Sequence, residues 1–582
     1  MNFYDLKSNL KKDYSGLKKV KVALLGDSAT QLLSKALKGY GFEVGYNFDI
    51  WEADYDQIEM QTYDLESDLY QFQPEYVIIY HSSEKLLKKF YKLDNDSKTS
   101  FAERHIQDIS NLYNTITSKI KCKVIYFNLV ETDDSVFGNY ANKTLSSYLY
   151  QVRKINYELM NLSQKHKNLF INDVASLHNN MGAAFCTDPK IYITTDLIFS
   201  LDFLPLVAKN ITDIILSIAG SIKKCIILDL DNTLWGGIIG DDGLENIHIG
   251  DLGIGKAFTA LQMWLKQLKQ RGIILAVCSK NTESIAKEPF EMHPDMVLKL
   301  SDIAVFVANW DNKVQNINYI QSILNIGFDS MVFLDDNPFE RNMVRTHIPD
   351  ITVPELPEDP SEYLTFLRSC NLFETASYTP EDEQRTQQYQ EEAQRSIVQK
   401  QCINEDEFLA GLNMHSTVKP FDKFSIPRVS QLTQRSNQFN LRTVRYTEEE
   451  ITNIAVSGDY LTIDFTLEDK YGDYGLISVI ILKKQSDSLF IDTWIMSCRV
   501  LKRGMEKFVL NQIVQQAKSF GAKQIIGEYL PTPKNAMVKG HYNDLGFIKC
   551  EGECNRWVLN VDSYSDYPVF ISADSETIKE LV

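Results

Sequence analysis

Residues 225–237 read CIILDLDNTLWGG, and this stretch decides the fold of the middle of the chain. The apolar run Cys225 to Leu228 leads into two carboxylates, Asp229 and Asp231, and a glycine pair follows. An unbroken apolar run is typical of a strand buried on both faces. Because side chains alternate along a strand, carboxylates two residues apart point to the same side. We expect a parallel strand from Cys225 to Asp231 with this pair at its carboxyl end, where open α/β sheets bind ligands.

Further polar residues follow other predicted strands. Ser279 ends the run IILAVCS, Asp335 and Asp336 end SMVFLDD, and Lys313 follows NWDN. In such a site one carboxylate attacks phosphorus and a second acts as acid and base. The attack brings two anions together, so a lysine and Mg²⁺, which prefers oxygen ligands, are needed to offset the repulsion. The order predicts a phosphoryl-transfer site, although each residue alone also fits a turn acid, a core hydroxyl or a surface lysine.

The stretches DLDNTLWGG, CSKN, NWDNK and FLDDNPFER resemble the four motifs of the haloacid-dehalogenase (HAD) superfamily. Over residues 222–355 the sequence around these motifs resembles that of the FkbH-like branch, subfamily IIIC. The resemblance implies a Rossmann-like core with the following roles: Asp229 as nucleophile, Asp231 as general acid/base, Ser279 and Lys313 as phosphate-binding residues, and Asp229, the Asp231 carbonyl and Asp335 as Mg²⁺ ligands supported by Asp336.

The spacing of these motifs leaves no room for a separate cap domain. Asp231 and Ser279 are 48 positions apart, and Ser279 and Lys313 are 34 apart. A capless site excludes water poorly from a small substrate, so a bulky substrate or a neighbouring domain should complete its closure. We therefore favour a substrate that is presented by, or handed on to, another protein.

The N-terminal 221 residues alternate predicted strands and helices, which indicates a doubly wound α/β domain. Gly26-Asp27-Ser28 resembles the nucleophile turn of SGNH esterases. The stretch Leu201 to Pro205 carries leucine where that family has its histidine base, and His81 is more typical of a strand-end residue than of a replacement base. We expect a degenerate SGNH-like, flavodoxin-type domain with a structural or docking role; the alternative is an esterase.

The C-terminal part mixes strands with a predicted helix at 505–520, which indicates an α+β fold. The strand–turn–helix SCRVLKRGME (497–506) resembles the acetyl-coenzyme A motif of GNAT acyltransferases, except that Glu506 stands where glycine or alanine is usual. A domain that grips the phosphopantetheine arm of a carrier protein, or an acyl intermediate, is the interpretation that we favour. The candidate acyl-transfer residues are Cys498, Arg499, Arg503, Gly504 and His541; the alternatives are a core cysteine and a surface histidine.

Composition and length limit the partners, the cellular location and the number of domains that we expect. The chain has 582 residues and a net charge of -18, which opposes nonspecific nucleic-acid binding. Its nine cysteines, an odd number, fit a reducing compartment. The sequence shows neither a leader peptide nor a membrane span, so we expect a cytoplasmic protein. The predicted divisions are an SGNH-like domain at 1–221, a HAD core at 222–360, a linker with a bridging helix at 361–405, and a GNAT-like domain at 406–582.

The FkbH-like resemblance also implies a reaction. Such proteins take a glyceryl group from 1,3-bisphosphoglycerate, remove the phosphate and load the glyceryl group onto an acyl carrier protein. We expect this chain to couple a phosphatase to acyl transfer in the same way, with a phosphorylated small molecule as substrate. The rival interpretations are a stand-alone Mg²⁺ phosphatase and a non-catalytic docking scaffold.

Overall fold

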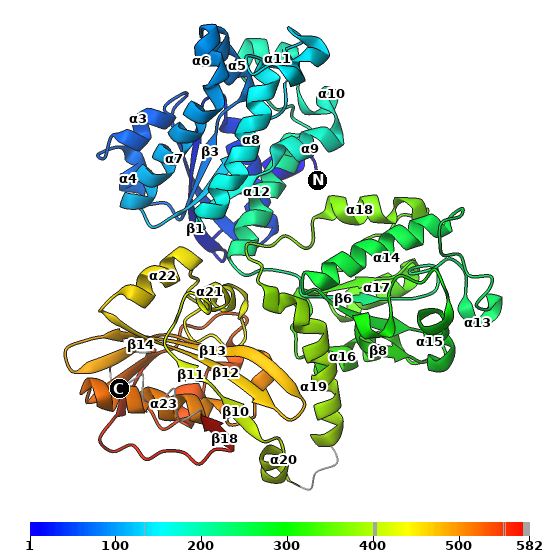
Figure 1. The fold of residues 1–582 in the computed structure, drawn as a ribbon, viewed down its shortest axis with the longest axis vertical. Coiled ribbons are helices and arrows are strands. Elements are labelled where there is room, and N and C mark those ends of the chain that lie inside the picture. Colours follow the sequence, from blue (N-terminus) through cyan, green and yellow to red (C-terminus); the bar gives the residue numbers. More distant parts are fainter. Residues whose placement is uncertain (133, 400–403, 551, 553–554, 574–582) are drawn as a thin grey trace. The chain divides into compact units, whose positions relative to one another are not determined.

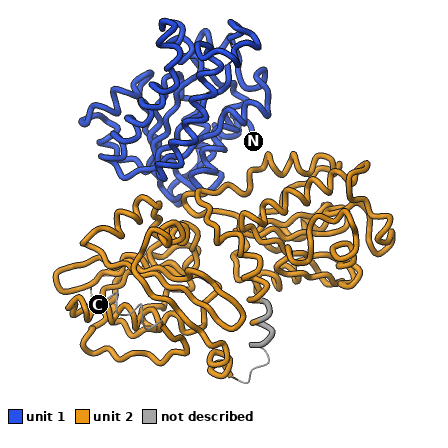
Figure 2. The backbone as a smooth tube through the Cα atoms, in the orientation of Figure 1, with its two compact units in different colours: residues 1–216 blue, residues 217–582 orange. Residues whose placement is uncertain are grey.

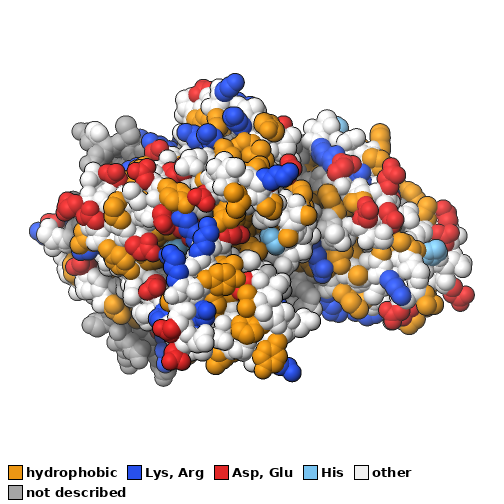
Figure 3. Space-filling model, turned by 90° about the horizontal axis from the view of Figure 1, so that it is seen from above, with side chains coloured by type: hydrophobic (Ala, Val, Ile, Leu, Met, Phe, Trp, Pro, Cys, Tyr) orange, Lys and Arg blue, Asp and Glu red, His pale blue; other side chains and the backbone are white. Residues whose placement is uncertain are grey.

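The computed structural model describes residues 1–132, 134–399, 404–550, 552 and 555–573. The chain divides into two compact units, 1–216 and 217–582 (Figure 2). On the molecular face drawn in Figure 3, acidic and basic side chains are interspersed despite the excess of acids over the whole chain. In the described part of the chain, no helix combines the length and the apolar character needed to cross a membrane.

The first unit is built on a parallel sheet with the strand order β2-β1-β3-β4-β5. This order is that of flavodoxin-like doubly wound sheets, whereas the SGNH-like assignment stays a prediction. Its strands are β1 (Lys18–Gly26), β2 (Tyr46–Glu52), β3 (Tyr76–Tyr80), β4 (Lys123–Phe127) and β5 (Leu169–Asn172). Its α-helices are α1 (Phe3–Asn9), α2 (Gln31–Glu43), α3 (Ile58–Tyr63), α4 (Asp68–Phe72), α5 (Ser83–Tyr91), α6 (Asn95–Thr99), α7 (Phe101–Lys119), α8 (Tyr148–Lys165), α9 (Val174–Met181), α10 (Ala183–Cys186), α11 (Pro189–Thr195) and α12 (Leu204–Ile218).

The second unit begins with a four-stranded parallel sheet in the order β8-β7-β6-β9. Its elements are β6 (Cys225–Leu228), α13 (Ile239–Asp242), α14 (Gly255–Gln270), β7 (Ile274–Ser279), α15 (Glu283–Met292), β8 (Ile303–Ala308), α16 (Lys313–Leu324), β9 (Met331–Leu334), α17 (Pro338–His347) and α18 (Tyr363–Cys370). Ile226 and Leu228 of β6 pack with α14, α15 and α18, whereas Cys225 and Ile227 pack with α16 and α17 on the other face. Successive side chains of β6 therefore point to opposite faces of the sheet and belong to two separate hydrophobic cores.

The rest of the second unit is a larger, mostly antiparallel sheet in the order β16-β17-β15-β14-β13-β12-β10-β18, with β11 paired to β12. Its elements are α20 (Glu405–Gly411), β10 (Met414–Ser416), β11 (Val418–Lys419), α21 (Ile426–Arg435), α22 (Glu448–Val456), β12 (Tyr460–Asp469), β13 (Gly472–Lys484), β14 (Ser488–Met496), α23 (Met505–Phe520), β15 (Gln524–Glu528), α24 (His541–Asp544), β16 (Ile548–Lys549), β17 (Arg556–Asn560) and β18 (Ile571–Ala573). The apolar face of α23, which the sequence predicts at 505–520, packs into the core of this sheet.

One helix, α19 (Arg385–Gln399), contacts both sheets of the second unit (Figure 1). Gln390 donates to the carbonyl of Ile303 on the four-stranded sheet (2.9 Å). Arg395 forms a bidentate ion pair with Asp469, which ends β12. The bridging helix expected within 361–405 therefore has contacts on each side, and α18 belongs to the core of the four-stranded sheet. The predicted domain boundaries themselves stay predictions.

Asp382 joins these parts because its fully buried carboxylate meets three arginines. Its Oδ1 lies 2.8 Å from both Arg385 and Arg435 and 3.9 Å from Arg428. Gln431 and the backbone amide of Thr379 donate to its other oxygen. Burial alone would raise the pKa of Asp382, but these arginines lower it below the ordinary 3.8.

We predict that Asp382→Asn lowers the free energy of unfolding by about 3–5 kcal/mol, because it leaves buried guanidinium groups unpaired. Asp329→Asn is the control, because Asp329 is partly exposed beside Lys534 and should cost about 0–1 kcal/mol. Urea denaturation at pH 7 measures both. Since the folded pKa is lowered, the contribution of Asp382 is present above 3.8 and is lost as the pH falls below it. Equal unfolding midpoints for the two variants at pH 7 would contradict the prediction.

Candidate functional site

The residues of the four motifs meet at one edge of the four-stranded sheet, where its parallel strands end. Asp229 directly follows β6, and its amide donates to the carbonyl of Leu334 at the end of β9 (2.9 Å). Ser279 is the last residue of β7 and is buried. Strand β6 ends at Leu228 rather than at Asp231, so Asp231 lies in the loop beyond the strand.

Lys313 supplies the cation of this edge. It is the first residue of α16, is 2% exposed, and its ammonium lies 3.0 Å from Asp229 Oδ2 and also contacts Asp335 Oδ2. Burial opposes its charge, but Asp229 and Asp335 outweigh burial and raise the pKa of Lys313 above its usual value. The ammonium is therefore fixed in its charged form between the two carboxylates.

Three carboxylates at this edge fit a divalent cation. One oxygen from each of Asp229, Asp335 and Asp336 can lie within 4.8 Å of the others. Asp229 Oδ1 is buried and accepts no hydrogen bond. Burial, and then the charge of Asp229, raise the pKa of Asp335 to about 6 and also raise the pKa of Asp336. The single positive charge of Lys313 does not balance three carboxylates. Their oxygen atoms form a donor set that suits an ion such as Mg²⁺, which prefers oxygen ligands.

Asp231 lies apart from that carboxylate group and is held by three donors. Its Oδ1 accepts from the indole of Trp235 and from the amide of Ile239, both at 3.0 Å. Its Oδ2 accepts from Asn281 at 3.1 Å. Burial raises the pKa of Asp231, and the charge of Asp229 raises it further. A fixed carboxyl group with a raised pKa can both give and take a proton.

Three residues without a predicted role shape this edge. Trp235 and Asn281 orient Asp231, and Arg341 donates to the carbonyls of Asp335 (2.8 Å) and Asp336 (2.7 Å). All three lie inside the stretches that carry the family resemblance, DLDNTLWGG, CSKN and FLDDNPFER. The motif wording therefore contained the signal, but only the fold reveals which atoms the residues hold.

The candidate acyl-transfer residues are not gathered at one point. Cys498 and Arg499 line a cavity of about 430 Å³, and the carbonyl of Cys498 accepts from Asn325 at 3.2 Å. Arg503 is engaged elsewhere, in an ion pair with Glu392 (2.6 Å). Gly504 precedes α23 with a φ of 75°, a left-handed conformation that favours glycine.

His541 lies in an aromatic cage rather than at the surface. Its ring packs edge-on against Trp494 and Phe439, with centroid distances of 4.5 Å and 4.9 Å. Its Nε2 is buried and has no hydrogen-bond partner. Burial lowers the pKa of His541 to about 3, so the ring stays neutral near pH 7.

The edge of β14 is covered by the chain's own backbone. Strand β14 pairs with β15 only from Ser488 to Phe490, and its later residues face another segment. There the amide of Met496 donates to the carbonyl of Phe439, and Asn440 bridges to Ile495. An extended ligand such as a pantetheine arm could pair with such an edge only if it were free. This covered edge argues against ordinary coenzyme A binding along β14.

The esterase-like residues of the first unit form no nucleophile–base pair. Both oxygens of Asp27 accept from the amide of Ser82 at 3.0 Å. His81 contacts the hydroxyl of Tyr126 at 2.6 Å, and burial lowers the pKa of His81 well below its usual value. Neither contact involves the hydroxyl of Ser28, which is buried.

The chain is similar to a solved structure that contains a phosphatase domain. A crystal structure of the N-terminal part of the protein BF1531 from Bacteroides fragilis, containing a phosphatase domain complexed with Mg, is 55% identical; the match covers 65% of this chain and 100% of that one, with a TM-score of 0.63. The family model of the FkbH N-terminal domain matches residues 21–216. The chain belongs to the FkbH-like family of HAD proteins.

Other comparisons carry less weight. The ribosomal-protein-S18-alanine N-acetyltransferase from Escherichia coli is 14% identical over 26% of this chain and 97% of its own, with a TM-score of 0.21. Spermidine N-acetyltransferase from Vibrio cholerae, in complex with CoA and spermine, is 13% identical over 25% and 96%, also with 0.21. Values this low assign no fold, so the GNAT-like character stays a prediction. The curated proteins that were compared include no match to the chain.

We predict that His541 does not titrate between pH 5 and pH 8. Its folded pKa lies below the ordinary 6.5, so any stability gained from the neutral ring is present above 6.5 and is lost as the pH falls. Nuclear magnetic resonance of histidine-labelled protein measures this, and the variant His541→Gln assigns the signal. A midpoint near 6.5 for that signal would overturn the prediction and restore His541 as a candidate base.

Proposed function

We propose that this protein is a Mg²⁺-dependent phosphoryl hydrolase that works through an aspartyl-phosphate and is coupled to transfer of a glyceryl-like acyl group to an acyl carrier protein. The carrying observation is the group of three carboxylates, Asp229, Asp335 and Asp336, of which the buried Asp229 and Asp335 contact the ammonium of Lys313. The Mg of the 55% identical structure supports the choice of metal. The proposed substrate is a phosphorylated small molecule, with 1,3-bisphosphoglycerate the compound that the family resemblance suggests.

In the phosphatase step a carboxylate oxygen of Asp229 attacks phosphorus, and the ester oxygen leaves with a proton from Asp231. Water then gives a proton back to Asp231 and cleaves the aspartyl-phosphate, which releases phosphate and restores both residues. Lys313 offsets the charge of the incoming phosphate, and Ser279 binds one of its oxygens. Held by Asp229, Asp335, the carbonyl of Asp231 and the supporting Asp336, Mg²⁺ would supply further positive charge there.

In the acyl-transfer step the thiolate of Cys498 attacks the carbonyl carbon of an acyl phosphate. A C–S bond forms, the C–O bond to phosphate breaks, and phosphate leaves with the electron pair. The phosphopantetheine thiolate of the carrier then attacks this thioester, a new C–S bond replaces the bond to Cys498, and Cys498 leaves as the thiolate. Arg499 lies beside Cys498 in the cavity wall. The buried, neutral His541 is the weakest of the candidates, and Arg503 and Gly504 serve the geometry of the turn.

A stand-alone Mg²⁺ phosphatase is the second candidate function. The observation in its favour is that the site needs only Lys313 at the start of α16 and three carboxylates that follow β6 and β9, namely Asp229, Asp335 and Asp336. That set requires no residue of the C-terminal sheet.

We predict that Asp229→Asn lowers the rate of phosphate release by several orders of magnitude, because the amide cannot act as the nucleophile. Removal of Mg²⁺ with EDTA should abolish release, and added Mg²⁺ should restore it. Asp311→Asn, a change at an exposed carboxylate close in sequence to Lys313, is the matched control. Full activity in EDTA, or in the Asp229→Asn variant, would refute the phosphatase.

We predict a stable mass increase on a phosphopantetheinylated carrier after incubation with Mg²⁺, candidate acyl phosphates and the protein. Cys498→Ala should abolish the adduct because the thioester cannot form, whereas Cys370→Ala, a change at another partly buried cysteine, should not. Asp229→Asn should instead leave a carrier adduct that still bears the phosphate. Intact-protein mass spectrometry distinguishes these products. An unmodified carrier across a broad panel, with phosphate still released, would favour the stand-alone phosphatase.

A further inference from the structure

The cavity beside Cys498 lies at the amino end of β6, whereas Asp229 lies at the carboxyl end of the same strand. Lys224, which lines the cavity, directly precedes β6, and Asp229 directly follows it. At about 3.3 Å per residue, their backbones are roughly 16 Å apart. Helix α16 gives a second measure, because Lys313 at its start contacts Asp229 and Asn325 at its end contacts the backbone of Cys498. A helix of this length spans about 18 Å.

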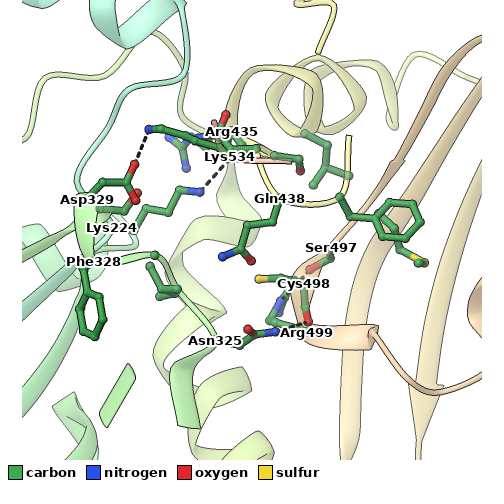
Figure 4. A pocket seen from close by; sticks show the side chains of 18 of the residues that line it. Lys224, Asn325, Phe328, Asp329, Arg435, Gln438, Ser497, Cys498, Arg499 and Lys534 are labelled. Atoms are coloured by element: carbon green, nitrogen blue, oxygen red, sulfur yellow. Dashed lines mark hydrogen bonds and ion pairs between the residues drawn. The ribbon is translucent and has the colours of Figure 1, made fainter. Parts of the chain in front are cut away.

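The wall of this cavity carries an excess of positive charge. Two carboxylates line it, Asp329 and Asp350, and the cationic residues that line it are Lys224, Arg385, Arg428, Arg435, Arg499 and Lys534. Asp329 is paired with Lys534, and Asp350 is exposed. Figure 4 shows Lys224 and Cys498 extending into the cavity from different sides, with Gln438 between them. The volume of about 430 Å³ suits a small ligand.

Two cations of this wall, Lys224 and Arg499, donate hydrogen bonds to neutral groups. Lys224 donates to the carbonyl of Arg435 (2.8 Å), and Arg499 donates to Gln388, Ser497 and the carbonyl of Tyr474. The three arginines around Asp382 share that one carboxylate. Arg428 is 6% exposed, and its Nε is buried without a hydrogen-bond partner. Buried charges are normally paired, so this wall favours an anionic ligand.

We infer that this cavity binds the phosphate monoester of a small acyl compound and holds it beside the thiol of Cys498. A dianion matches the charge excess better than the monoanionic phosphodiester of a carrier-bound phosphopantetheine arm. Arginine and lysine side chains bind phosphate through charge-assisted hydrogen bonds. The acyl part of this assignment rests on the proposed acyl-transfer function, whereas the phosphate binding does not.

The titration behaviour of the wall agrees with this inference. Burial, together with neighbouring arginines, lowers the pKa of Lys224 to about 8 and the pKa of Arg428 and Arg435 each to about 9. A bound dianion would oppose these shifts by stabilising the charged forms.

Because Cys498 and Asp229 are far apart, the acyl-transfer step and the hydrolysis step have to occur in a fixed order. A phosphorylated acyl group attached to Cys498 keeps its phosphate in the cationic cavity, at the opposite end of the strands from Asp229. Hydrolysis at Asp229 therefore follows transfer of the acyl group from Cys498 to the carrier, whose arm delivers the phosphate to the other edge. The free thiol of Cys498 is then ready for the next acyl phosphate.

Isothermal titration calorimetry with 3-phosphoglycerate in EDTA tests the site without any turnover. We expect 3-phosphoglycerate to bind and glycerate, which lacks the phosphate, not to bind. Lys224→Met and Arg385→Met should each weaken binding at least tenfold, whereas Lys223→Met, at the adjacent lysine outside the cavity wall, should not. Circular dichroism and the unfolding midpoint establish that each variant is folded.

The outcomes separate this inference from the proposed function. Binding that survives in Cys498→Ala and Asp229→Asn, without any carrier adduct from wild-type protein, would uphold the phosphate site and remove the acyl-transfer role. Failure of the folded wild-type protein to bind 3-phosphoglycerate would overturn the inference. Equal binding by wild type, Lys224→Met and Arg385→Met would also overturn it, as would binding of coenzyme A in preference to 3-phosphoglycerate.

Discussion

The buried ammonium of Lys313 is the interaction on which the phosphoryl-transfer edge depends. It contacts the carboxylates of Asp229 and Asp335, which follow neighbouring parallel strands. Without a cation these carboxylates would repel one another, and at about 4 Å the repulsion is roughly 4 kcal/mol at an effective dielectric of 20. The amino end of α16 therefore has to meet the carboxyl ends of β6 and β9. That requirement ties the start of α16 to the two neighbouring strands whose ends carry the carboxylates.

The sequence was sufficient for this edge because its signals are local. Each functional residue stands at the end of an apolar run or directly after a short motif, and parallel strands bring such ends together. The helix at 505–520 also matched, since its apolar periodicity is regular. The end of β6 was placed too late, because Leu230 is as apolar as the strand before it although it lies in the loop.

The surroundings of other residues could not be predicted from the local sequence, because the residues that they contact are distant in the chain. The group around Asp382 joins residues 46 to 53 positions away on α21, and no motif marks it. Arg503 is taken up by Glu392 from α19, so it is not free for a ligand at the turn. His541 looked like a surface residue, but the aromatic rings around it come from distant strands and loops. In each case tertiary packing, rather than the surrounding sequence, decided what the side chain does.

Asp382 shows how folding and ligand binding limit each other in the second unit. With no carboxylate there, three guanidinium groups would repel one another in a buried setting, at a large cost in stability. With one carboxylate for each of these three arginines, the wall would lose two units of net positive charge and with them much of its attraction for a phosphate. A single carboxylate holds α21 and α19 together and leaves the cavity positive. Natural proteins commonly give up stability at sites of function in this way. The net charge of the whole chain is -18, so the positive cavity is a local exception to the overall charge of the protein.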